Sequence, residues 1–164
     1  MSAKQLIETL GKLLVLHIDL YELAIQKTDM IKKGDTVTLN NLLKDERKYI
    51  QAIQKVEKER IQDAREFLQN GEVGNKQPSM TECINNAIGL EEQTLKRLKN
   101  ELEEQILLLK QKNELNQQLL KESLQFLNIS LDLLIPDMDS YNYERTGQNQ
   151  QYEQQRRSIF DSKA

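Results

Sequence analysis

The fold is decided by residues 95–134, which read LKRLKNELEEQILLLKQKNELNQQLLKESLQFLNISLDLL. Twelve positions in this stretch, mostly leucine, recur at steps of three or four residues: Leu95, Leu98, Leu102, Ile106, Leu109, Asn113, Asn116, Leu120, Leu124, Leu127, Leu131 and Leu134. The mean step is about 3.5 residues, close to the period of an α-helix, so these side chains share one face. The spacing predicts one long helix with a leucine seam.

Two more helical segments precede this one. Residues 2–33 carry apolar side chains at helical spacing, and the Lys32-Lys33-Gly34 sequence then supplies cations and a left-handed residue, which commonly end a helix. A second helix is predicted from Thr38 to Asn70, because Asn70-Gly71 favours a turn. Its start is the less defined end, since Thr36-Val37-Thr38 offers no clear cap.

The long helix has its own start and stop signals. Ser79 and Glu82 have the spacing of a capping box, in which each side chain satisfies a backbone amide of the first turn. Gly89 can separate a short helix at 80–88 from the long one, and Pro136 ends the pattern.

Composition supports an all-α fold. Leucine outnumbers valine 26 to 4, and the chain of 164 residues holds only 6 glycines and 2 prolines, which excludes an all-β protein. We expect an elongated antiparallel bundle of three helices, or four with the short one, with coiled-coil-like packing. The bundle domain is predicted over 1–135. Residues 136–164 are rich in glutamine and poor in aliphatic residues, so a flexible, disordered tail is expected there.

Charge and hydropathy exclude several classes of partner. The formal net charge of −3 argues against binding to nucleic acid, which favours a basic face. The longest apolar runs have four residues, too few for membrane insertion. Cys83 is the single cysteine, and no export signal is recognisable, so a cytoplasmic protein is expected.

No motif of catalysis or metal binding emerges. His17 is the only histidine, and we interpret it as a packed side chain bonded to a neighbour, because no second histidine or acidic cluster supports a site. Cys83 has no base beside it in the sequence and is interpreted as a small, partly buried residue. We therefore predict neither an enzyme nor a cofactor or metal.

Two asparagines interrupt the leucine seam. Asn113 and Asn116 either are buried and fix the register of the helices, or mark where the seam turns toward water. The long helix is expected to extend beyond the first two by roughly a dozen residues. Its terminal leucines then either form an exposed binding stripe or pack on the first helix as core.

Several segments, in order, resemble the FlgN family of flagellar export chaperones. The run Gln111–Leu120, with Asn-x-x-Asn-x-x-Leu-Leu, and the following Ser-Leu-x-Phe at 123–126 resemble the family signature. Gly34-Asp35, Glu46 and residues 57–60 resemble its first hairpin, and residues 143–147 match a Tyr-x-x-x-Gly element.

The resemblance implies a chaperone that binds the helical C-terminal segments of hook–filament junction proteins and escorts them to the export gate. It implies client contacts by the last part of the leucine seam and gate docking by Tyr143. The residues assigned to the client are Asn116, Leu120, Leu124, Leu127, Leu131 and Leu134. The alternative is a structural coiled coil that binds only itself, with the leucine stripe as the seam of a homodimer.

Overall fold

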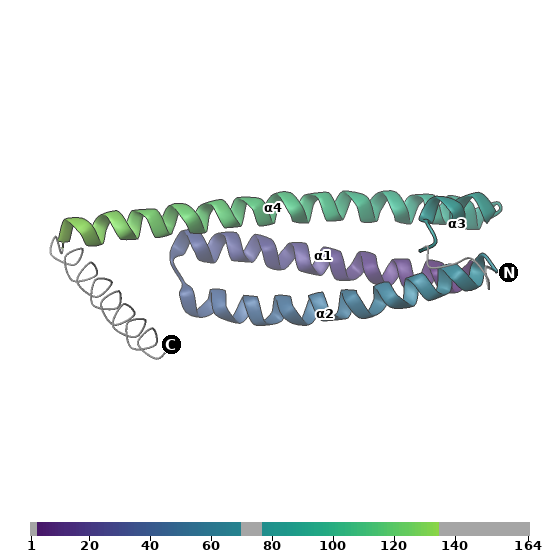
Figure 1. Ribbon diagram of the computed structural model, residues 1–164, viewed down its shortest axis with the longest axis horizontal. Coiled ribbons are helices and arrows are strands. Elements are labelled where there is room, and N and C mark those ends of the chain that lie inside the picture. Colours follow the sequence, from purple (N-terminus) through teal and green to yellow (C-terminus); the bar gives the residue numbers. More distant parts are fainter. Residues whose placement is uncertain (1–2, 70–76, 135–164) are drawn as a thin grey trace, which may run out of the picture. The chain divides into compact units, whose positions relative to one another are not determined.

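The computed structural model describes residues 3–69 and 77–134, and it is helical almost throughout. The elements are α1 (Lys4–Lys33), α2 (Thr36–Phe67), α3 (Met80–Asn86) and α4 (Leu90–Leu134) (Figure 1). The all-α prediction is confirmed. The chain divides into two compact units, Met1–Leu119 and a second that begins at Leu120 within α4, and each is described by itself. The predicted domain boundary at 135 stays a prediction.

The turn between α1 and α2 follows its sequence. Gly34 adopts φ +69°, and its amide donates to the Ile31 carbonyl, as the C-terminal signal predicted. The expected start of the second helix at Thr38 is wrong by two residues. Asp35 is the cap: its carboxylate accepts a hydrogen bond from the Thr38 amide at 3.0 Å, so the helix begins at Thr36.

The predicted capping box is present. Ser79 accepts from the Glu82 amide and the Glu82 carboxylate accepts from the Ser79 amide, which starts α3 at Met80. The short helix ends at Asn86, slightly earlier than predicted. Gly89 then takes φ +62°, a left-handed backbone that interrupts the helical path and lets α4 begin at Leu90.

Helices α1 and α2 form an antiparallel hairpin. Near the turn, Lys27 makes an ion pair with Glu46 at 2.7 Å, and both side chains are largely shielded from solvent. At the opposite end of the hairpin, Thr9 hydrogen-bonds to Asp63. The two contacts join the start of one helix to the end of the other, which defines the antiparallel direction.

The first part of α4 runs parallel to α1. The Ala3 amide donates to Glu91 at 3.2 Å, and Thr28 donates to Asn116 at 2.6 Å. Both pairs are separated by 88 residues in sequence, so the register between the two helices stays constant along α1. This is the up–down–up order that an antiparallel three-helix bundle requires.

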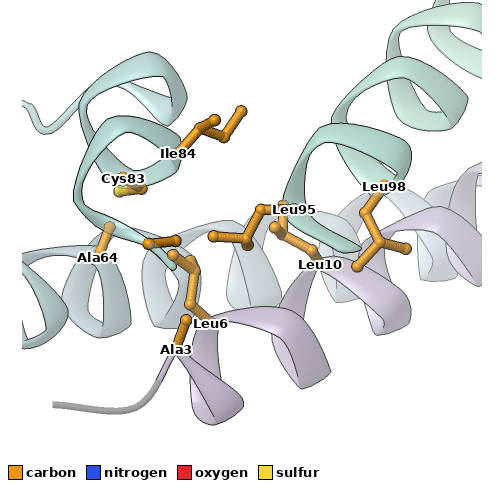
Figure 2. Packing of buried hydrophobic residues seen from close by; sticks show 9 residues of the cluster. Ala3, Leu6, Leu10, Ala64, Cys83, Ile84, Leu95 and Leu98 are labelled. Atoms are coloured by element: carbon orange, nitrogen blue, oxygen red, sulfur yellow. The ribbon is translucent and has the colours of Figure 1, made fainter. Parts of the chain in front are cut away.

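The best-packed core lies where all four helices of the first unit meet (Figure 2). Every helix contributes to it, and the buried members are Ala3, Leu6, Leu10, Ala64, Cys83, Ile84, Ala87, Leu95 and Leu98. Of the predicted seam, only Leu95 and Leu98 belong to this cluster, with Leu102 packed against it, whereas Ile106 further along α4 is 46% exposed. The short α3 adds Cys83 and Ile84 and closes this end of the bundle.

Within the described ranges, no helix is both long enough and apolar enough to cross a membrane. The predicted tail, 136–164, lies outside the described residues.

Candidate functional site

One contact between α1 and α4 is polar and involves Asn116. The Asn116 side chain is only 3% exposed, and its amide nitrogen donates to the Ala24 carbonyl at 2.9 Å. Its oxygen accepts from the Thr28 hydroxyl, which also bonds to the Ala24 carbonyl. Of the two interpretations of Asn116, burial in the seam is therefore the observed one. A buried amide with every bond directed at one partner helix fixes the register.

Asn113, one turn earlier, is placed differently. Its side-chain oxygen is buried but accepts no hydrogen bond from any residue of the described chain, and the same holds for the Gln105 oxygen. Buried amide oxygens without donors lower stability. Of the two asparagines, only Asn116 therefore holds the helices together through its side-chain oxygen.

After Asn116, α4 continues through residues 117–134. The predicted stripe falls in this continuation, and its side chains are exposed: Leu124 by 60%, Leu127 by 53%, and Leu120 and Leu131 by about 40% each. Leu134 is the last residue of α4, and its side chain lies outside the described residues, as does Tyr143.

We call Leu120, Leu124, Leu127 and Leu131 the first apolar face. The same segment carries a second set of exposed apolar side chains that the sequence analysis did not assign. Phe126, Ile129 and Leu133 are 73%, 59% and 78% exposed and recur at steps of three and four. We call them the second apolar face. The signal was available in the sequence, since the same spacing rule that identified the first face also identifies this one.

Two parts of the helix surface, one wider and one narrower, separate the first apolar face from the second, and they carry different residues. At about 100° per residue, Lys121, Gln125 and Asn128 lie together on the wider side and form a polar strip. Ser123 and Ser130 lie on the narrower side, between the faces. The Ser130 hydroxyl donates to the Phe126 carbonyl at 2.9 Å, so its polarity is satisfied within the helix.

His17 and Cys83, the two residues considered for catalysis, lie in the first unit. His17 Nδ1 is 2.8 Å from the Leu13 carbonyl oxygen, in a cleft of the first unit that Ile53 and Leu102 also line. This agrees with a packed histidine bonded to a neighbour. Cys83 is fully buried, and burial raises the pKa of its thiol, which disfavours the reactive thiolate. The described residues contain no cluster of acidic, histidine and cysteine side chains that could hold a metal.

The sequence was also compared with those of known proteins. Residues 1–151 match the profile of the family described as FlgN protein. The chain belongs to the FlgN family. It is also 38% identical to a protein of Bacillus subtilis (strain 168) called uncharacterized protein YvyG, over 164 residues and the full length of both chains. No solved structure matches the chain.

Membership of the FlgN family confirms the resemblance found in the sequence and the general function that it implies. FlgN proteins are flagellar export chaperones and not a family of enzymes, so the chain is assigned to flagellar protein export. The match covers α1 to α4 completely, including the continuation of α4 with its two apolar faces.

Proposed function

We propose that this FlgN-family protein is a cytoplasmic chaperone that binds the helical C-terminal segments of hook–filament junction proteins and escorts them to the flagellar export gate. The observation that carries the proposal is the exposure of the first apolar face, in a helix of a flagellar chaperone family. Exposed apolar stripes of this length are characteristic of surfaces that receive an amphipathic helix.

The chemistry of the face suits such a client. Between residues 120 and 131, only Lys121 and Glu122 are charged, and neither belongs to the first apolar face. A client helix that later polymerises must keep its own apolar side chains out of water before export. Covering them with leucine requires shape and apolar area alone, so the proposed function needs no cofactor.

Asn116 has a different part in the proposal from the one predicted. It stands at the start of the predicted stripe, but its side chain is buried and its amide bonds to Thr28 and Ala24 of α1. We therefore assign it to holding α4 on α1 in one register. Contact with the client begins after it, at Leu120.

Docking at the export gate rests on the family resemblance alone. We propose Tyr143 for it, within the Tyr-x-x-x-Gly element at 143–147. A Tyr143→Ala variant is expected to keep its affinity for the client and to lose affinity for the purified cytoplasmic part of the gate. Loss of client binding in this variant would contradict the separation of the two roles.

The client site is tested with a matched pair of variants. Leu124→Glu combined with Leu127→Glu places two carboxylates on the first apolar face, where binding would have to bury them. Gln125→Glu combined with Asn128→Glu adds the same charge to the polar strip of the same helix. With a purified hook–filament junction protein as the probe, we expect the first variant to lose at least about a hundredfold in affinity and the second to change little.

The control for folding is the melting temperature of each variant. The first unit contains neither pair of substitutions, so we expect both variants to melt like the parent protein. If the Leu124/Leu127 variant unfolds, these leucines are core; if it is folded and binds as well as the parent, the client site lies elsewhere. The parent could instead form a homodimer and bind no junction protein. If the Leu124/Leu127 variant then splits that homodimer, the protein is the self-associating coiled coil.

A further inference from the structure

The continuation of α4 is apolar over more of its circumference than one partner helix can cover. Within each face the side chains fall within about 60° of one another, and the centres of the two faces lie about 150° apart. With the serine-bearing side between them, the two faces extend over about 220°, whereas a helix that packs on one neighbour typically carries a stripe of about 100°. A single helix on the first face would leave Phe126, Ile129 and Leu133 in water.

The first unit provides an internal comparison. α1 has two neighbours, and different sides of it meet them: Thr9 and Lys27 contact α2, while Ala24 and Thr28 contact α4. A helix of this chain that has two partners therefore shows two contact faces. Residues 120–133 show two faces as well, and both are exposed.

We propose that residues 120–134 are held between two helices of the same client chain, one on each apolar face. The inference rests on the proposed function and specifies its partner: a pair of connected amphipathic helices with apolar inner faces. Helices pack at about 8–10 Å between axes, so the two client helices lie less than about 20 Å apart on either side of α4. A short connection between the two client helices spans that distance.

The small size of the second face favours a client helix over a second copy of the chain. Three side chains from each copy bury several hundred Å² at most, below the roughly 1,200 Å² of a stable interface. A client already attached to the first face brings its second helix at high effective concentration, so even a small face adds affinity. The serines between the faces also fit this position, because small side chains allow two neighbours to approach the helix closely.

Charge-introducing variants separate the two faces. Phe126→Glu combined with Ile129→Glu disrupts the second face only, and the Gln125/Asn128 pair on the polar strip remains the control. Using a purified full-length junction protein as the probe, we expect the second-face variant to bind at least about tenfold more weakly than the control, with one client per chain. A photo-crosslinking residue placed at Phe126 is expected to mark a different client segment from one placed at Leu127.

Each other result overturns the inference. Unchanged affinity in the second-face variant, or crosslinks from both positions to one client helix, would show a single-helix client. A parent dimer that becomes monomeric in this variant while client affinity is kept would assign the second face to self-association. These failures are distinct from failure of the proposed function, in which the parent protein itself does not bind the client.

Discussion

At the scale of single residues, Asn116 and Asn113 make a matched test of what a buried amide contributes. Asn116→Ala removes the acceptor of the Thr28 hydroxyl and the donor to the Ala24 carbonyl, so we expect it to lower the free energy of unfolding by about 1–3 kcal/mol. Asn113→Ala removes an oxygen that has no donor, so its cost should stay below about 1 kcal/mol. Urea denaturation of both variants measures the difference.

Equal costs for the two substitutions would contradict the role given to Asn116. A larger cost for Asn113→Ala would show that its oxygen has a donor in solution. Neither result would bear on the apolar faces, because both asparagines belong to the first unit.

Two glycines give opposite predictions, because one requires a left-handed backbone and the other does not. Gly89 has φ +62° and open space around it, so Gly89→Ala is opposed only by backbone strain of about 1–2 kcal/mol. Gly11 lies inside α1, with nothing within 4 Å of an added Cβ, so Gly11→Ala should raise stability by about 0.5–1 kcal/mol. Melting temperatures are expected to move in opposite directions; a shift in the same direction would contradict the backbone assignment at one of them.

At the scale of the elements, the cap of α2 predicts a pH dependence. Hydrogen bonds from Thr38 lower the pKa of the Asp35 carboxyl, since they favour its charged form. A group with a lowered folded-state pKa stabilises the protein above its unfolded pKa, and the stabilisation is lost as pH falls through the folded value. The parent protein should therefore melt above an Asp35→Asn variant at neutral pH.

The same pair of proteins is then compared in acid. The difference in melting temperature should shrink as the pH falls below about 3.9, the ordinary value for an aspartate, and disappear below the lowered pKa of Asp35 in the folded protein. A difference of the same size at both pH values would mean that the carboxylate charge has no part in capping α2.

Helix positions could be predicted from the sequence because their signals are local. Each signal lies within a few residues of the helix whose position it determines. These signals are the Ser79 capping box, Gly34 and the seam that begins at Leu95. The start of α2 differs from the prediction because Thr36–Thr38 contains no clear capping residue. The cap is Asp35, which stands three residues before the amide that it caps.

The contacts between helices could not be predicted in the same way. Helical spacing shows which side chains share a face but not which residue of another helix they meet. The 88-residue separation that joins Thr28 to Asn116 depends on the loop length and on packing across the whole bundle. The second apolar face could have been predicted from the sequence, because its residues recur at helical spacing. Phe126 also belongs to the segment that resembles the family signature.

At the scale of the whole molecule, the longest helix, α4, carries exposed apolar side chains on two faces between residues 120 and 133. The first unit has a closed apolar core and polar contacts that fix its register, whereas residues 120–133 of α4 include no buried side chain among those described. The proposed function places client binding on residues 120–133 and leaves the stability of the fold to the first unit.

The most direct test is the mass of the protein in solution with and without a purified hook–filament junction protein, measured by light scattering after size exclusion. We expect a complex with the mass of one chain plus one client. The Leu124/Leu127 double glutamate variant should not form this complex. A mass that stays the same when the client is added, with the chain eluting as a homodimer, would contradict the chaperone assignment of these apolar faces.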